Sequence, residues 1–286
     1  MVASSGNNKE GSKNLIHISE VQVKELFSKT KLPDADYVCN PYVGCTHKCI
    51  YCYAEFMKRF TNHNDNWGDF IDIKKVSSIK IPEFKENQTI LFSSVTDPYN
   101  SFEKKYEATR KILKKLTGTK AHVEILTKSA LVTRDIDLIK QFSNIKVGIS
   151  MNTLDDKFRK EIEPYASSVE KRLDVLYKLN AEGINTYVFI SPIFPGICDY
   201  ESIIEKIYKH THYICFENLN LRGSYKGRVM NYIKDTRPYL LPLYDNIYNK
   251  NDNSYWERLK DDTLKTCEKY GVDCRIYFYH DKIKKK

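Results

Sequence analysis

Short apolar runs rich in β-branched residues recur along the chain, and segments with helical periodicity separate them. Each run has the length of a strand and is bounded by polar turns. The predicted strands lie around Asp36–Cys39 and at Thr89–Ser94, His122–Thr127, Ile145–Ser150, Ile184–Ile190 and Tyr213–Phe216. Strands that alternate with helices predict a parallel sheet made of right-handed βαβ units.

Apolar residues three and four positions apart predict the helices. In Val169–Leu179 these positions form one stripe, and Gly183 follows as a stop signal before the next strand. Further helices are predicted at Ser19–Ser28, Tyr53–Phe60, Phe102–Leu116 and Ser254–Tyr270, and a last strand at Arg275–Tyr279.

Six strand and helix units fit the 286 residues, whereas a closed eightfold barrel would need two more. The fold class is therefore predicted as α/β, a partial (β/α)6 TIM-like barrel with a parallel sheet and a C-terminal extension. We expect a disordered polar leader at residues 1–18, the barrel at residues 19–222, and an extension at residues 223–286 that closes the barrel. Sites in such folds gather at the carboxyl ends of the strands, so polar residues there are the first candidates.

Composition narrows the class of protein. Lysine and arginine number 46 against 37 aspartate and glutamate, a net charge of +9. This balance is compatible with a nucleic-acid partner and equally with a solvated surface. No apolar run approaches the roughly 20 residues that span a bilayer, and the start of the chain lacks the apolar centre of an export signal. We therefore predict a cytoplasmic protein with no membrane segment, in which the eight cysteines are reduced thiols.

Three of the cysteines stand in one short loop. Cys45, Cys49 and Cys52 are separated by three residues and then by two. Thiolates are soft ligands for iron–sulfur clusters and zinc, and a cubane cluster held by three cysteines keeps one iron free for another ligand. Gly44 permits the tight bend that wraps the loop around such a centre. The alternatives are a structural Cys3His zinc site that includes His47, and cysteines that are buried together by chance.

The cysteine spacing, with Tyr51 directly before the last cysteine, resembles that of the radical S-adenosylmethionine (SAM) superfamily. Three later stretches, Ile149–Thr153, Ser168–Leu173 and Val188–Ile193, resemble the spore photoproduct lyase branch. The opening Asn-Pro-Tyr-x-Gly-Cys is closer to relatives of that lyase described as DNA repair photolyase-like. The resemblance runs from about residue 36 to residue 218 and implies the same partial barrel.

This resemblance implies a radical SAM enzyme of lyase or oxidoreductase type. A [4Fe-4S] cluster on the three cysteines would take one electron from a donor such as flavodoxin or ferredoxin, and its open iron would bind SAM. Reductive cleavage of SAM would then give methionine and a 5′-deoxyadenosyl radical, which abstracts hydrogen from the substrate.

Polar residues after three predicted strands are the candidate SAM contacts. After Thr89–Ser94 the family often carries Gly-Gly-Glu, which is absent here; hydroxyls and a carboxylate stand there instead, and Asp97-Pro98 is equally typical of a turn. Lys128 would pair with the SAM carboxylate. The resemblance also implies that Arg172 lies near SAM, although a helix arginine alone would be interpreted as solvent-facing. The full set of expected contacts is Tyr51, Ser93, Ser94, Thr96, Asp97, Lys128, Ser150, Asn152, Arg172 and Phe194.

The substrate is predicted to be a nucleobase or nucleic acid, as the lyase branch implies. The lyase that splits the thymine photodimer uses a cysteine beside a threonine as hydrogen donor, but Val95 stands at the matching place between Ser94 and Thr96. We expect Cys198 to be the substitute donor. Two alternatives stay open. One is the same radical chemistry on a peptide or small metabolite, with a pocket formed by the tyrosine-rich segment Tyr225–Tyr255; the other is a noncatalytic Cys3His zinc-binding module.

Overall fold

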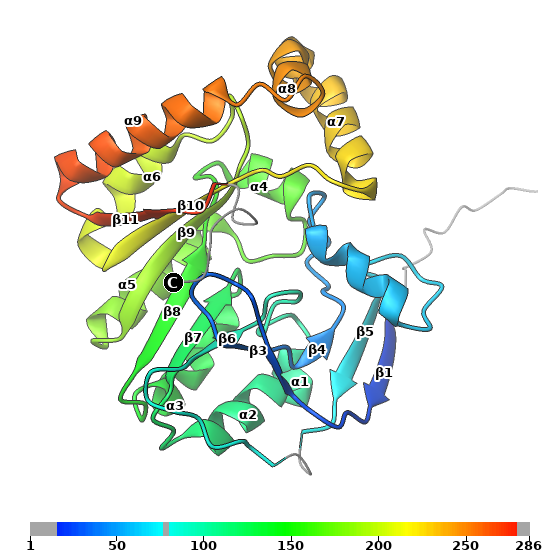
Figure 1. Cartoon of the computed structure of the whole chain (residues 1–286), viewed down its shortest axis with the longest axis vertical. Coiled ribbons are helices and arrows are strands. Elements are labelled where there is room, and N and C mark those ends of the chain that lie inside the picture. The colour runs from blue at the N-terminus through cyan, green and yellow to red at the C-terminus, as the bar shows by residue number, and fades with distance from the viewer. Residues whose placement is uncertain (1–15, 77–79, 279–286) are drawn as a thin grey trace, which may run out of the picture.

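A large, mainly parallel sheet forms the centre of the computed structural model, which describes residues 16–76 and 80–278. In spatial order its eight strands are β11 (Asp273–Ile276), β10 (Tyr213–Asn218), β9 (Asn185–Ile193), β8 (Ile145–Ser150), β7 (His122–Thr127), β6 (Thr89–Phe92), β3 (Tyr37–Cys39) and β2 (Phe27–Lys29). All neighbouring pairs from β3 to β11 are parallel, and β2 is antiparallel to β3. Because β2 and β11 remain as edges, the described sheet is open (Figure 1).

The strand order confirms the predicted α/β fold with a partial barrel. From β3 through β6 to β10, each strand pairs with the strand that follows it in the same sheet, as in a series of βαβ crossover units. These strands are the six predicted from the apolar runs. β11 adds a further parallel strand beside β10. It ends at Ile276, and Tyr279, the last residue of the strand predicted there, lies outside the described residues.

Helices fill most connections between the strands. The α-helices are α1 (Glu103–Tyr106), α2 (Ala108–Leu116), α3 (Ile136–Ile139), α4 (Asp156–Ile162), α5 (Val169–Ala181), α6 (Tyr200–Ile207), α7 (Ser224–Thr236), α8 (Leu241–Tyr248) and α9 (Ser254–Tyr270). The 3₁₀ segments are η1 (Tyr53–Phe60), η2 (Ala130–Asp135), η3 (Tyr208–His210) and η4 (Pro238–Leu240). The helices predicted over Val169–Leu179 and Ser254–Tyr270 are confirmed by α5 and α9. Among the described residues, no helix combines the length and apolar character needed to cross a membrane.

The helix predicted over Phe102–Leu116 is divided at Glu107, whose backbone is left-handed with a φ of 52°. The cause is Glu103, a buried carboxylate that accepts hydrogen bonds from the backbone N–H groups of Thr109 at 2.9 Å and Arg110 at 3.2 Å. These bonds satisfy free donors at the start of α2, so α1 ends before α2 begins.

A second, three-stranded sheet corrects the N-terminal prediction. The helix predicted at Ser19–Ser28 is wrong, because β1 (His17–Val21) pairs in parallel with β5 (Phe70–Lys74), and β5 pairs with β4 (Tyr42–Val43). Pairing with the buried β5, which is distant in sequence, overrides the local helical pattern. Residues 17 and 18 of the predicted leader belong to β1, and its first fifteen residues lie outside the described ones. In Figure 1 this small sheet (blue to cyan) stands beside the large one.

Gly148 in β8 leaves room for an aromatic ring on the neighbouring strand. A Cβ at this position would lie 2.2 Å from the ring of Tyr187, which stacks on Tyr213 with ring centres 5.0 Å apart. Gly148→Ala should therefore destabilise the protein by roughly 1–3 kcal/mol, the usual cost of overpacking. As matched control, Gly227→Ala in α7 meets no atom within 4 Å and should stabilise by about 0.5–1 kcal/mol. Urea unfolding measures both, and equal midpoints for the two variants would contradict the packing argument.

Candidate active site

A cavity of about 450 Å³ opens at the carboxyl ends of the parallel strands. Its wall combines the cysteine loop with residues that end or follow β6, β7, β8, β9 and β10. The lining includes Cys45, His47, Cys49, Tyr51, Cys52, Ser93, Ser94, Val95, Thr96, Asp97, Thr127, Lys128, Ser150, Ser191, Glu217 and Arg222. This is the position at which α/β barrels place their active sites.

The three loop thiols share this cavity. Burial raises the pKa of the Cys45 thiol to about 12, and the neighbouring Asp97 and Cys52 add to the rise. Burial likewise raises the pKa of Cys49, with Glu163 and the other two loop cysteines adding to it. The thiols therefore keep their protons at neutral pH until a soft cation displaces them. Three thiols on one cavity wall fit a metal cluster with an open position.

Hydrogen bonds fix the loop on two sides. Gly44 has a φ of 94°, and a Cβ there would lie 2.5 Å from the carbonyl oxygen of Phe70, so the need for glycine in this bend is confirmed. The Thr96 hydroxyl donates to the Gly44 carbonyl, and the Ile50 N–H donates to the carbonyl of Ile162 at 3.0 Å. The loop is thus held in place by protein groups alone.

Ser93 offers the cavity a hydroxyl that has no hydrogen-bond partner in the described part of the chain. Its backbone is left-handed, with a φ of 72°, directly after β6. The residue is 8% exposed, and among the described residues its Oγ finds no hydrogen-bond partner. A buried polar atom in this state costs stability unless a ligand satisfies it. The arrangement fits a polar ligand in the cavity, and the uncommon backbone conformation is typical of functional sites.

Asp97 joins the ends of β6 and β7. Its carboxylate accepts from the Thr127 hydroxyl at 2.7 Å and from the Lys128 backbone N–H at 2.8 Å. It also accepts from the Tyr99 N–H at 2.8 Å, which is the turn that the Asp-Pro sequence predicts. Nδ1 of His47 lies 3.6 Å from the same carboxylate. Asp97 therefore lines the cavity but aligns two strand ends through its bonds to protein donors.

A buried carboxylate that the sequence pattern did not reveal organises the wall behind the thiols. Glu163 is fully buried and accepts hydrogen bonds from the Tyr51 hydroxyl and the Arg172 guanidinium. Burial alone would raise the pKa of Glu163, but Arg172 and Lys128 outweigh it and hold that pKa below its ordinary value. Against the effect of burial, Glu163 holds the pKa of Lys128 above its ordinary value. Lys128 is thus a cation at neutral pH, with its ammonium 5.9 Å from the centre of the Tyr51 ring.

The position of Arg172 in the sequence could have predicted that Glu163 is buried. Arg172 stands three residues after Val169 and four before Leu176, which puts it on the apolar stripe of α5. A charge on that stripe needs a buried counter-charge, and Glu163 is close in sequence. The structure buries Arg172 to 1% exposure, so the solvent-facing interpretation is wrong.

Residues 39–207 match the family profile described as the Radical SAM superfamily. The chain belongs to the radical SAM superfamily. Members of this family use a [4Fe-4S] cluster and SAM, and three cavity-wall thiols with one ligand missing fit such a cluster. The predicted family and cofactors are confirmed, and family membership favours the cluster over the Cys3His zinc alternative.

Two relatives show how this radical SAM chain compares with other sequences. An uncharacterized protein of Methanocaldococcus jannaschii is 38% identical over 261 residues, which cover 90% of this chain and 95% of that protein. A radical SAM Nalpha-GlyT isomerase of a Pseudomonas phage is 26% identical over 172 residues, which cover 57% of this chain and 34% of that protein.

Solved structures of spore photoproduct lyase share the fold. A cysteine-to-serine variant of the lyase superposes with a TM-score of 0.68 at 16% identity, over 91% of this chain and 82% of that one. A second variant, with bound AdoMet and a dinucleoside spore photoproduct, gives a TM-score of 0.66 at 15% identity, over 91% of this chain and 81% of that one. At this level of identity the likeness supports the radical SAM fold and not a particular reaction.

The radical SAM cavity takes in most of the expected SAM contacts. Those on its wall are Tyr51, Ser93, Ser94, Thr96, Asp97, Lys128 and Ser150. The others, Asn152, Arg172 and Phe194, are buried and do not line it. Arg172 donates to the backbone carbonyls of Ser150 at 3.0 Å and Ser167 at 2.9 Å, and Phe194 packs edge-on against Tyr51 at 5.7 Å. We therefore interpret these residues as supports of the wall.

Cys198, the expected hydrogen donor, does not line the cavity. Its N–H donates to the Phe194 carbonyl at 3.1 Å in the turn after β9, and the residue packs against the main apolar core. Burial raises the pKa of its thiol to about 12, as for an inert core cysteine. The placement does not support a donor role, because this half-buried thiol packs against the core and does not line the cavity. Of the tyrosine-rich segment Tyr225–Tyr255, Tyr225 reaches the cavity wall.

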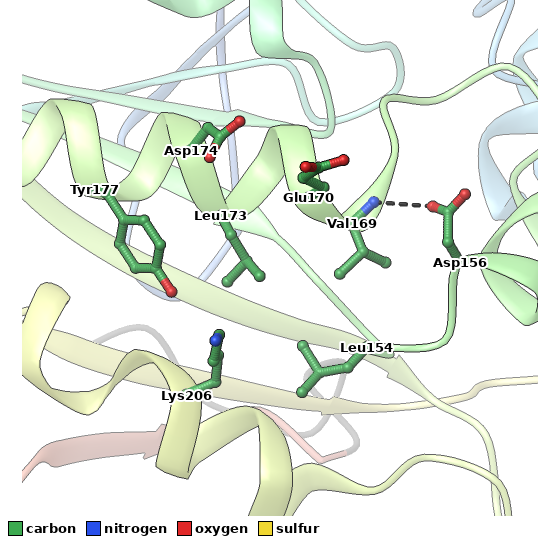
Figure 2. Close-up of a pocket in the computed structure, with 8 residues that line it drawn as sticks. All are labelled: Leu154, Asp156, Val169, Glu170, Leu173, Asp174, Tyr177 and Lys206. Atoms are coloured by element: carbon green, nitrogen blue, oxygen red, sulfur yellow. Dashed lines mark hydrogen bonds between the residues drawn. The ribbon is translucent and has the colours of Figure 1, made fainter.

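A second hollow of about 400 Å³ lies between α5 and α6, on the helical side of the sheet (Figure 2). Leu154, Leu173 and Tyr177 form its apolar part, and the Asp156 carboxylate at its edge accepts from the Val169 N–H at 2.9 Å. The residues drawn in Figure 2 include no thiol, and none of them lines the strand-end cavity. We therefore place the radical SAM active site at the strand ends.

Proposed function

We propose that this radical SAM enzyme acts on a nucleobase within nucleic acid. The observation that carries the proposal is a group of exposed aromatic side chains beside a cation, which follows the cluster cysteines and reaches the cavity through Phe56. One comparison agrees with it, since the solved lyase variant holds a dinucleoside photoproduct.

The η1 platform consists of Phe56, Arg59 and Phe60, on the 3₁₀ segment that follows Cys52. The Arg59 guanidinium lies 5.4 Å from the centre of the Phe56 ring and 4.7 Å from that of Phe60. Phe60 is 66% exposed, while Phe56 is 43% exposed and also lines the cavity. Exposed rings beside a cation are the surface on which unpaired bases stack. In the proposal, this platform holds the bases that flank the reacting one.

The cavity residues have distinct proposed roles. When bound, the cluster and SAM supply a radical that removes hydrogen from an unreactive C–H bond. Cys45, Cys49 and Cys52 hold the cluster as thiolates. Lys128 pairs with the SAM carboxylate, and the unpartnered Ser93 hydroxyl bonds to another polar group of SAM. The buried Glu163 network keeps Lys128 charged and Tyr51 in place.

The wall favours a reaction that needs no thiol donor. Val95 lines the cavity at the place that corresponds to the donor cysteine of the lyase, and the thiols among the described lining residues are the three cluster cysteines. An isomerisation balances without a donor, because the hydrogen removed from one carbon is returned to the product. The phage relative, named as an isomerase, is consistent with this class. We therefore propose a rearrangement of the base rather than photodimer repair.

Anaerobic turnover tests the proposal. The reconstituted protein is incubated with SAM, a one-electron reductant and either a single-stranded oligonucleotide or a tyrosine-containing peptide. Liquid chromatography then separates base isomers, which have the same mass as the unaltered base, and deuterium transfer from a labelled substrate to the 5′ carbon of SAM or 5′-deoxyadenosine reports hydrogen abstraction. We expect new base isomers in the oligonucleotide and an unaltered peptide. An altered peptide with unchanged bases would refute the nucleic-acid substrate and favour the peptide alternative. If SAM, bases and peptide all remain unchanged with a fully loaded cluster, the radical reaction itself is refuted.

Phe60→Ala and Arg59→Ala should each weaken the binding of a single-stranded oligonucleotide. Loss of one stacked base costs about 1–3 kcal/mol, which corresponds to roughly 5- to 150-fold in Kd. Arg59→Ala should also reduce the slope of log K against log salt concentration by about 0.7. Arg258→Ala, at an exposed position of α9, is the matched control. Fluorescence anisotropy over a salt series measures both effects, and a wild-type affinity that is independent of salt would count against a nucleic-acid partner.

A further inference from the structure

A group of metal-binding side chains lies outside the cavity, at the small sheet. His17 begins β1, while His63 and Asp65 stand in the segment between η1 and β5. One potential ligand atom of each residue lies within 4.8 Å of the other two. None of the three lines the strand-end cavity. We propose that His17, His63 and Asp65 form a zinc site that is separate from the cluster.

The spacing of the ligand atoms is close to that of a tetrahedral zinc site. Nδ1 of His17 lies 3.2 Å from Oδ2 of Asp65, and Nδ1 of His63 lies 3.6 Å from the same oxygen. With bonds of about 2.0–2.1 Å, two ligands of a tetrahedral zinc ion stand about 3.3–3.4 Å apart. Two of the three separations are therefore near the required length. The third separation, between the two histidine nitrogens, is at most 4.8 Å, and a small rotation of the half-exposed His17 ring would shorten it.

His63 is held in the orientation that zinc ligation requires. Its Nε2 bonds to Oδ1 of the buried Asp72 at 2.7 Å. Its ring also stacks on Phe70, with ring centres 4.0 Å apart. When Nε2–H donates to a carboxylate, the neutral ring presents the lone pair of Nδ1 on its other side. This pairing of a ligand histidine with a second carboxylate is the usual support of a zinc ligand.

The three ligand atoms need a metal ion or a proton between them. Two imidazole nitrogens and a carboxylate oxygen this close repel one another through their lone pairs unless a metal ion or a proton intervenes. The alternative to the zinc site is therefore a proton-linked pair of His17 and Asp65, whose Nδ1 and Oδ2 atoms lie 3.2 Å apart. Two nitrogens with one carboxylate suit zinc better than calcium or magnesium, which prefer sites made of oxygen atoms. Three protein ligands leave the fourth position to water.

A zinc ion here would join two segments that are distant in sequence. It would fasten the first residue of β1 to the segment that leads from the η1 platform into β5. The proposed role is therefore to hold these two segments together, and it holds whether or not the substrate is nucleic acid.

Zinc itself is the probe in the test. The full chain is reconstituted anaerobically so that its cluster occupies the loop thiols, and bound zinc is measured by elemental analysis and by competition with a chromophoric chelator. We expect the wild type to bind one zinc ion at this site. His17→Ala and Asp65→Asn should lower the zinc affinity by about 10-fold or more. His122→Ala, at the exposed start of β7, should leave it unchanged.

A second measurement separates this site from the thiols. In a variant with alanine at all three loop cysteines, Co²⁺ should bind with the absorption of nitrogen and oxygen ligands and without sulfur-to-cobalt charge transfer. Adding His17→Ala to that variant should remove the signal. Two results would overturn the proposal in favour of the proton-linked pair. One is zinc binding that is equal in wild type, His17→Ala and Asp65→Asn; the other is no zinc bound by the wild type at micromolar concentration.

Discussion

Cys49→Ala is expected to remove the cluster and SAM cleavage together. Loss of a mere supporting partner of a metal ligand typically costs about 10- to 100-fold in affinity or activity. Loss of one of three ligands should exceed that range, because the two remaining thiols cannot hold three irons of a cubane. Iron and sulfide content with the visible absorption of the reconstituted protein report the cluster. Formation of 5′-deoxyadenosine from SAM under reducing conditions, in the absence of substrate, reports the chemistry.

Cys198→Ala is the matched control, since it removes a half-buried thiol that packs against the core and does not line the cavity. The cluster, SAM cleavage and product formation should all survive this change. A cluster that persists in Cys49→Ala would reject the ligand assignment. Loss of product with an intact cluster in Cys198→Ala would instead restore the donor role expected from the sequence.

Glu163→Ala should destabilise the protein by about 3–5 kcal/mol, because it leaves the Arg172 guanidinium buried without a counter-charge. Glu170→Gln, at an exposed position of α5, should change stability by less than about 0.5 kcal/mol. Urea unfolding measures both.

The double variant Glu163→Ala/Arg172→Met should recover much of the loss, since removing both charges leaves no unpaired ion. The affinity of the double variant for SAM should nevertheless stay below that of the wild type. Tyr51 loses its hydrogen bond to Glu163, and the Ser150 carbonyl loses its hydrogen bond from Arg172. Full stability of the single variant would contradict the pairing.

The same pair gives stability a pH dependence. Burial alone would raise the pKa of Glu163, but Arg172 and Lys128 hold it below its ordinary value of 4.5. The stabilisation is therefore complete above the ordinary value and is lost as the pH falls through the lower pKa of the folded protein. The difference in unfolding free energy between wild type and Glu163→Ala should shrink over that acidic range. A difference that stays constant would show that the contact is not electrostatic.

Most strands of the large sheet could be predicted from the sequence. Strands and helices that are adjacent in sequence bury them, and the buried positions appear as apolar runs. β7 and β8 lie between parallel strands and under helices, so their apolar runs mark them directly. β1 was not predictable in this way. Its exposed and half-buried residues carry little pattern, and its conformation depends on β5, which is far along the sequence.

The sequence predicted which residues belong to the candidate site, but not which of them line the cavity and which lie behind its wall. The cysteine loop and the strand ends placed Lys128 and Ser150 on the cavity wall. The sequence could not show that Arg172 and Phe194 lie one layer behind them, because a polar or aromatic residue beside a strand end suits either place. Glu163 was missed for a related reason, since it follows α4, a helix in which five of the seven residues are charged. The one signal for Glu163 in the sequence is Arg172, a charged residue on the apolar stripe of α5 that needs a buried counter-charge.

The cavity opens at the carboxyl ends of the strands, where the connecting loops and not the closure of the sheet set the width of the entrance. If the substrate is nucleic acid as proposed, one nucleotide of a long polymer can be turned inward there while the strand on either side of it stays in solvent. Neither a free terminus nor prior excision of the nucleotide is then required. Such an enzyme would be able to modify internal positions of a continuous strand.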